Sequence, residues 1–158
     1  MKAWWMRFFQ HAYIKEKEYT ANVDRPQEQD MVRILCEMKE KIEQAHAECR
    51  LDHDLYDECR HLLIRLDLLL PYACITPPAI QQRILHLLME DAASILFPYL
   101  LLGEAGQSTA RRDFLCALRY MAGEARRIIA AIQEYEREAF LNRAAFIAKW
   151  NENSKTHL

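Results

Sequence analysis

The stretch that decides the fold is STARRDFLCALRYMAGEARRIIAAIQEYEREAFLNRAAFIAKW, residues 108–150. It contains no Pro and one Gly, and apolar residues recur through it in alternating steps of three and four: Leu118, Met121, Ala125, Ile128, Ile132, Tyr135 and Ala139. This spacing places the side chains along one face of a helix. Neither a strand nor a loop has a period of three to four residues. At 1.5 Å per residue, it predicts one helix of roughly 60 Å. We expect the rest of the chain to cover that face.

The composition predicts a single all-α domain. The 158 residues are 51% hydrophobic, too many for a disordered chain, and only three are Gly and five are Pro. A formal net charge of -2 gives no basic footprint for nucleic acid. The five Cys are odd in number and form no C-x-x-C pair, which favours a reduced, cytoplasmic protein with thiols packed as small apolar groups.

Further helices are predicted ahead of the long one. Residues 1–20 form an amphipathic helix whose face carries Trp4, Trp5 and Phe8. Residues 26–50 and 54–70 repeat the three-and-four spacing. The turn between these two helices offers Asp52 or Asp54 as the cap of the second, and Pro71 should end that helix.

The last helix before the long one begins near residue 76. Thr76 would supply a capping hydroxyl ahead of two prolines. Pro98 predicts a kink or a restart near Phe97. Residues 103–106 are then expected to form a loop, with Ser108 or Thr109 capping the long helix.

Short connections between these segments predict an up-down antiparallel helical bundle. Residues 1–158 would form one domain, in which an N-terminal amphipathic helix, 1–20, precedes a four-helix bundle, 26–150, and a frayed tail, 151–158. The longest apolar run, residues 92–102, is about half the length of a membrane span and contains Pro98, so we expect no transmembrane helix. The aromatic N-terminus lacks a small-residue cleavage site, and we expect no signal peptide.

The helix lengths predict that one end of the long helix is left uncovered. The three helices before it are about 17 to 25 residues long and can cover about 40 Å of a partner helix. The long helix should therefore project from about residue 131. Large exposed apolar surfaces typically mark interfaces, and the overhang of this helix carries Ile132, Tyr135, Ala139, Phe140, Phe146, Ile147 and Trp150.

Two E-x-x-H pairs suggest a metal-binding alternative. Glu43 with His46, and Glu58 with His61, have the spacing by which di-iron bundles present ligands, so Fe, Mn or Zn would be the metal. Helix rotation opposes this alternative. The first pair lies one residue after the apolar face and the second pair one residue before it, so both cannot point inward. Two charged, solvated faces are the simpler interpretation.

A zinc site around the same turn is a weaker alternative. His46, Cys49, His53 and Cys59 are zinc-ligand types, but they lack the tight repeated spacing of structural zinc sites. Core cysteines and surface histidines are the simpler interpretation. His86 is interpreted as a packed or edge histidine. The sequence contains no P-loop, no G-x-G-x-x-G and no G-x-S-x-G.

These observations favour a non-enzymatic protein–protein interaction or scaffold module whose partner is a second copy of itself, forming a homodimer. Its predicted interface comprises Trp4, Trp5, Phe8, Tyr135, Phe140, Phe146 and Trp150. Two alternatives stay open: a metal-binding bundle acting as an enzyme or sensor, and a peripheral membrane protein attached through residues 1–20. That N-terminal segment could also dock another protein or pack on the overhang.

Overall fold

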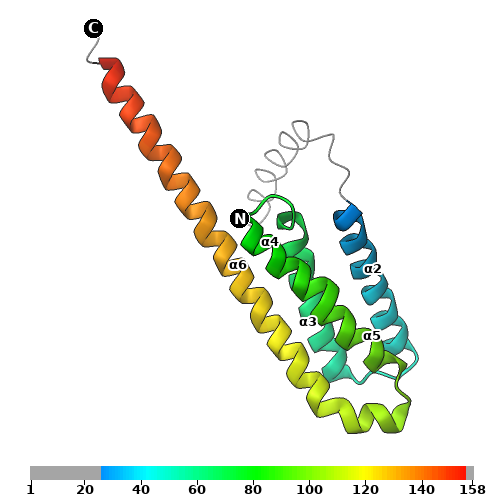
Figure 1. Cartoon of the computed structure of the whole chain (residues 1–158). Coiled ribbons are helices and arrows are strands. Elements are labelled where there is room, and N and C mark those ends of the chain that lie inside the picture. The colour runs from blue at the N-terminus through cyan, green and yellow to red at the C-terminus, as the bar shows by residue number, and fades with distance from the viewer. Residues whose placement is uncertain (1–25, 156–158) are drawn as a thin grey trace.

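The computed structural model describes residues 26–155, with side chains described from residue 29 to residue 150. These residues form an all-α bundle with a long C-terminal helix and contain no strand, which confirms the predicted fold class (Figure 1). The elements are α2 (Pro26–Ala47), α3 (His53–Leu69), the 3-10 turn η1 (Leu70–Tyr72), α4 (Pro78–Leu85), the π-helical segment η2 (His86–Ala92), α5 (Ala93–Leu101) and α6 (Glu104–Lys155). The predicted helix at residues 1–20 lies outside this range.

The core lies where the predicted apolar faces meet. Helix α6 packs most extensively on α3 and also contacts α4, η2 and α5. Its own buried side chains follow the predicted spacing: Phe114, Leu118, Met121, Ala125, Ile128 and Ile132. The other helices contribute further side chains to the same core, all essentially inaccessible to solvent: Leu35, Met38, Ile42, Leu62, Leu66, Leu69, Ile84, Leu87, Leu88 and Leu96.

Helix α2 ends at Ala47, earlier than the predicted Arg50, because Cys49 adopts a left-handed backbone conformation with φ 56°. The Arg50 amide donates to the Ala45 carbonyl at 2.9 Å, and the Cys49 amide donates to the His46 carbonyl at 3.0 Å. These two bonds form a Schellman motif, which closes the last turn of a helix. The left-handed position is usually occupied by Gly, so a Cys at this position did not indicate that the helix ends here.

Asp52, one of the two residues predicted to cap α3, is its N-cap. The Asp52 carboxylate accepts a hydrogen bond from the Leu55 amide at 3.0 Å. The same carboxylate accepts bonds from Arg111 at 2.9 and 3.3 Å, which connects the α2–α3 turn to α6. These bonds lower the pKa of Asp52, with the Arg111 bond as the main cause. At the other end, α3 gives way to η1 at Leu70, and Pro71 follows directly, as predicted.

The start of α4 differs from the prediction. Pro77 occupies the N-cap position and makes no side-chain cap bond. The Thr76 hydroxyl instead donates backward to the Tyr72 carbonyl at 2.8 Å, so its predicted capping role is wrong. Gln81 reaches back from the first turns of α4 and donates to the Thr76 carbonyl at 2.6 Å.

The helical run from Pro78 to Leu101 has its irregularity upstream of Pro98. The segment His86–Ala92 is π-helical, whereas α5 continues through Pro98 to Leu101. The expected restart near Phe97 does not occur. Proline lacks the amide that would bond to Ser94 four residues earlier, and Ser94 lies at an exposed position where water can replace that donor.

This run also corrects the expectation that no segment could span a membrane. Its 24 residues include a window of mean hydropathy 1.5, which is long and apolar enough to cross a bilayer by length and composition alone. Of that window, 39% is buried inside the protein. Ile84, Leu88 and Leu96 from this run belong to the core described above, and buried core helices of other proteins pass the same test.

Helix α6 begins at Glu104, so the predicted loop at residues 103–106 and the predicted caps Ser108 and Thr109 are wrong. The Thr109 hydroxyl donates to the Ala105 carbonyl within the helix at 3.0 Å. The first turns of α6 run in a different direction from the rest (Figure 1). They are held by the buried Gln107, whose side chain donates to the Tyr99 carbonyl at 3.3 Å. Tyr99 also stacks on Phe114, with ring centroids 3.7 Å apart.

Candidate interaction surface

Helix α6 leaves the bundle shortly after Ile132, which is its last buried side chain at 4% exposure. Tyr135 is 39% exposed, and from Phe140 to Trp150 every side chain is exposed. Figure 1 shows this part of α6 extending well beyond the other helices. The point of departure agrees with the length argument from sequence.

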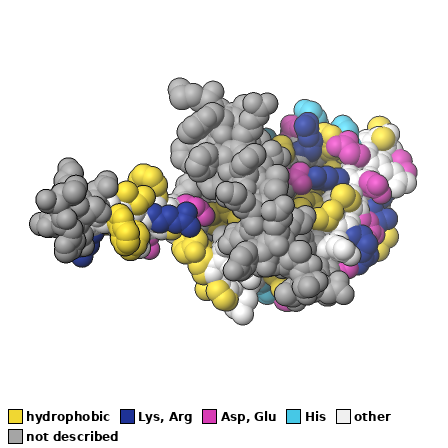
Figure 2. All heavy atoms as spheres, turned by 90° about the horizontal axis from the view of Figure 1, so that it is seen from above, with side chains coloured by type: hydrophobic (Ala, Val, Ile, Leu, Met, Phe, Trp, Pro, Cys, Tyr) yellow, Lys and Arg dark blue, Asp and Glu magenta, His cyan; other side chains and the backbone are white. Residues whose placement is uncertain are grey.

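We call residues 140–150 the distal segment. Its apolar members are Phe140, Leu141, Ala144, Ala145, Phe146, Ile147, Ala148 and Trp150. Phe140, Phe146 and Trp150 are 68%, 66% and 67% exposed. At 100° per residue, the apolar side chains extend around most of the helix, a pattern that normally belongs to buried helices. Figure 2 shows them gathered on the projecting part of the molecule with basic side chains beside them.

The overhang of α6 carries an asymmetric charge pattern. Glu134, Glu136 and Glu138 lie next to the bundle, whereas Arg143 and Lys149 lie in the distal segment. Arg137 Nε donates to Glu134 at 3.0 Å, and this bond lowers the pKa of Glu134. Among the described residues, Glu136, Arg143 and Lys149 form no ion pair.

Glu136 and Arg143 are one heptad apart and therefore lie on nearly the same side of α6, because seven residues make almost two full turns. This side of the overhang is a continuation of the side of α6 that faces the bundle at Ile132. Glu136 is half-buried and lies near the end of the bundle, where its charge contributes to raising the pKa of Tyr72, after burial as the main cause. Arg143 is exposed beyond it.

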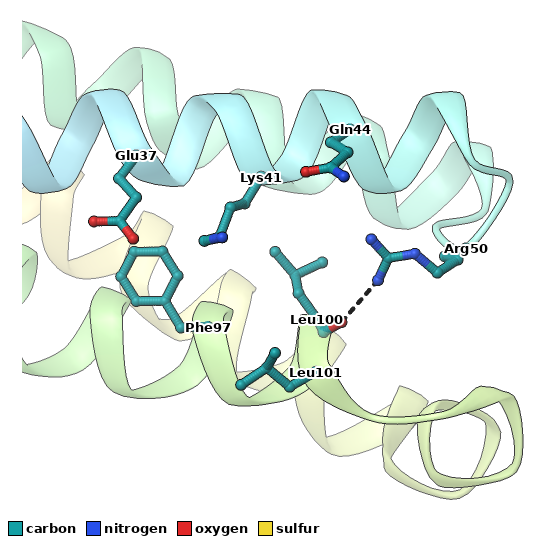
Figure 3. A pocket seen from close by; sticks show the side chains of 7 residues that line it. All are labelled: Glu37, Lys41, Gln44, Arg50, Phe97, Leu100 and Leu101. Carbon is teal, nitrogen blue, oxygen red and sulfur yellow. Dashed lines mark hydrogen bonds between the residues drawn. The ribbon is translucent and has the colours of Figure 1, made fainter.

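A second candidate site is a pocket of about 490 Å³ between α2 and α5 (Figure 3). Glu37 and Lys41 reach over it from α2, and Phe97 and Leu101 border it from α5. Arg50 Nη1 donates to the Leu100 carbonyl at 2.9 Å. This bond satisfies a carbonyl at the end of α5 that has no helical donor, which gives Arg50 a structural role at the pocket.

The predicted metal ligands face different neighbours. Glu43 accepts hydrogen bonds from the Tyr56 hydroxyl at 2.9 and 3.0 Å, and the His46 ring stacks on the Tyr56 ring at 3.8 Å. Glu58 instead accepts a bond from Arg119 of α6 at 3.3 Å. One pair therefore points toward α3, while Glu58 points toward α6.

The remaining candidate ligands are also dispersed. His61 is exposed, His53 lies 3.5 Å from Asp57, and Cys49 is exposed. Cys59 is buried in the core, and burial raises the pKa of its thiol to about 12. Within the described part of the chain, no three His, Cys, Asp or Glu side chains are placed to hold a metal ion.

His86 is an edge histidine on the π-helical segment. Its ring nitrogens lie 2.9 Å from Glu90 and 3.4 Å from Asp91, and its side chain is mostly exposed. The three groups line one exposed side of this helix.

The aromatic residues predicted for the interface divide into two groups. Tyr135, Phe140, Phe146 and Trp150 lie on the overhang as expected, whereas Trp4, Trp5 and Phe8 lie outside the described residues. Ile147, at 60% exposure, was predicted on the overhang but not among the interface residues, and Leu141, at 51% exposure, was missed. The signal that could have identified Leu141 was the scarcity of polar residues throughout 139–150, rather than the three-and-four spacing alone.

The described residues thus form an all-α helical bundle with a long C-terminal helix. No protein-family model, no curated protein and no solved structure matches it.

Proposed function

We propose that this protein is a helical protein–protein interaction module that acts by contact rather than catalysis, and that it self-associates through the distal segment of α6. The observation that carries the proposal is the exposure of Phe140, Phe146 and Trp150 on a helix that has left its own bundle. Aromatic side chains of this kind dominate the energetics of protein interfaces. The amphipathic segment predicted at residues 1–20 is a candidate second component of the same interface.

Burial of the solvent-exposed aromatic rings would supply the free energy of association. Burying one large apolar side chain contributes about 1.5–3 kcal/mol, and the distal segment offers several on one continuous helix. A second copy presents the same surface, so a two-fold symmetric contact can bury both surfaces at once.

Self-association can be tested by light scattering coupled to size-exclusion chromatography over a wide range of protein concentrations. We expect the mass to rise from the 18.7 kDa of one chain toward twice that value. Phe146→Glu should hold the protein at the mass of one chain, because the new carboxylate would be buried without a partner. Ala130→Glu is the matched control, since it adds the same charge at an exposed position on the part of α6 that the bundle supports.

The thermal midpoints of all three proteins should be measured at a concentration where they are monomeric. Equal midpoints would show that Phe146→Glu acts on association and not on folding. A wild-type chain that keeps the mass of one chain at every concentration would contradict self-association. So would Phe146→Glu associating as strongly as the control.

A further inference from the structure

We infer that residues 1–20 lie along the overhang of α6 in their own chain, as a helix antiparallel to it. They would cover the side of the overhang that is a continuation of the bundle-facing side. Residues 1–20 lie outside the described residues, and two properties place them: their predicted amphipathic face and the point where the chain joins α2. The contact concerns one chain, so it can hold whether or not two copies associate.

Residues 1–25 join the bundle at the end from which the overhang projects. Pro26 begins α2, which runs antiparallel to α3, with Lys39 of α2 paired to Asp67 near the end of α3 at 2.6 Å. Tyr72 follows that end of α3, and its pKa is raised by burial and then by the charge of Glu136 on α6. Figure 1 shows the start of α2 and the departure of α6 at the same end of the bundle.

The connection through residues 21–25 is long enough within one chain. Five extended residues span at most about 18 Å. Helix α3 contacts both α2 and α6, and packed helices lie about 8–10 Å apart, so the axes of α2 and α6 are within about 20 Å. A helix on the bundle-facing side of the overhang would be nearer to Pro26 than the α6 axis is.

The aromatic residues of the two segments would then lie at the same height above the bundle. Trp5 precedes Thr20 by 15 residues, or about 22 Å of helix, and Phe146 follows Ile132 by 14 residues, or about 21 Å. The rings of Phe146 and Trp150 are 6.3 Å apart and are both mostly exposed. The antiparallel orientation therefore brings the aromatic face of residues 1–20 onto this ring pair.

Charges near the bundle are complementary in the same orientation. Lys15 follows Phe8 by one heptad, so it lies on the aromatic side of its helix, about 8 Å from Thr20. Glu136 lies about 6 Å beyond Ile132 along α6 and has no ion-pair partner among the residues that the structure describes. The two opposite charges would thus meet at the same height.

Arg143 lies on the covered side and can be accommodated there. It follows Ile132 by 11 residues, and Phe9 precedes Thr20 by 11 residues, so the two would face each other. A guanidinium over an aromatic ring is a favourable cation–π contact. The long arginine side chain can also keep its charged end in water.

The opposite side of the overhang stays available to a second copy. Leu141, Ala144 and Ala148 lie roughly 140–160° around the helix from Phe146, at 100° per residue. The docked helix would extend past the core, so it would open as a local unit without unfolding the bundle.

Photocrosslinking in the full-length chain tests the contact. With p-benzoylphenylalanine in place of Trp5, illumination should join position 5 to residues 146–150 in a product with the mass of one chain, identified by mass spectrometry of the linked peptides. Products containing only links between two chains would overturn the contact within one chain. The absence of any link to α6 would overturn the docking altogether. Self-association is measured separately by light scattering, so each proposal can fail alone.

Charge reversal tests the register. Trp4, Trp5 and Trp150 are the only tryptophans in the sequence, so tryptophan emission reports on the aromatic contact. Lys15→Glu should shift the emission to longer wavelength and make acrylamide quenching more efficient, because two carboxylates would meet near Glu136. The double variant K15E/E136K should restore the wild-type emission.

Lys17→Glu is the matched control, since position 17 lies half a turn around the helix from Phe8 and makes the same change of charge. It should leave the emission unchanged. Equal shifts for Lys15→Glu and Lys17→Glu, or no recovery in the double variant, would contradict the register.

Discussion

Cys49 closes α2 with a left-handed backbone, and this conformation is unfavourable for any side chain that has a Cβ atom. Its side chain is exposed and contributes nothing to the core. We therefore expect Cys49→Gly to raise the free energy of unfolding by about 1 kcal/mol, because Gly is the residue that Schellman motifs favour. Urea denaturation provides the measurement, and Cys49→Ala is the control that keeps the backbone cost. A glycine variant less stable than the alanine variant would contradict this account.

The buried thiol of Cys59 should make the stability of the fold decrease at alkaline pH. Burial raises the pKa of its thiol to about 12 from an ordinary value of 9.0. The folded protein holds this proton while the unfolded chain loses it, so the contribution is complete below about pH 9 and falls as pH rises toward 12. The loss has an upper limit of about 1.4 kcal/mol per pH unit.

The test is urea unfolding of the wild type and Cys59→Ala between pH 7 and about pH 10.5. The alanine variant is less stable at neutral pH because it leaves a cavity, yet its stability should fall less steeply with pH. Parallel pH profiles for the two proteins would show that the thiol does not titrate in this way.

At the scale of the element, α6 is one helix with two environments. Leu118 is 1% exposed in the core, whereas Leu141 is 51% exposed in the distal segment. Leu118→Ala should lower the free energy of unfolding by about 2–5 kcal/mol, and Leu141→Ala by less than about 0.5 kcal/mol in dilute, monomeric protein. Chemical denaturation at low protein concentration measures both. A large loss for Leu141→Ala would mean that the distal segment packs within its own chain.

The apolar faces of the helices were predictable because burial imposes a period of three to four residues on long segments. Leu118, Ile128 and Ile132 lie in the core where that period placed them. The exposed overhang followed from helix length alone, since 1.5 Å per residue leaves little freedom.

Helix ends were less predictable because several residue types can cap a helix or form the turn that follows it. The loop expected at 103–106 relied on Gly103 and Gly106, yet neither has a positive φ, and Gly106 sits inside the first turns of α6. Cys49 occupies the left-handed position at the end of α2, where a glycine would have indicated that the helix ends. The Thr76 hydroxyl donates to the Tyr72 carbonyl behind it instead of accepting from an amide of α4.

The candidate interface was partly predictable. Tyr135 belongs to the three-and-four spacing of the core, so periodicity identified it. Phe146 and Ile147 were predicted only as apolar residues of the overhang. Leu141 was missed, because an apolar surface that surrounds a helix has no single face for periodicity to detect. The ion-pair partners of α3 were not predictable either, since the Glu58 contact with Arg119 depends on how two helices rotate against each other.

On the scale of the whole molecule, ion pairs between helices end where the bundle ends. Arg111 contacts Asp52, Arg119 contacts Glu58, and Glu124 accepts from Arg83 of α4 at 2.6 Å. Beyond Glu124, no ion pair joins α6 to another described helix. Such exposed pairs add little stability individually, but they set the rotation and height of α6 against α3 and α4.

The projection of α6 past Ile132 separates the distal segment from the bundle. The helix rises about 21 Å over the 14 residues from Ile132 to Phe146. A partner that binds around Phe146 would therefore sit past the end of the bundle rather than on its side. Small-angle X-ray scattering of the monomer should give a distance distribution with a long tail beyond its main maximum, whereas one compact maximum would contradict the projection.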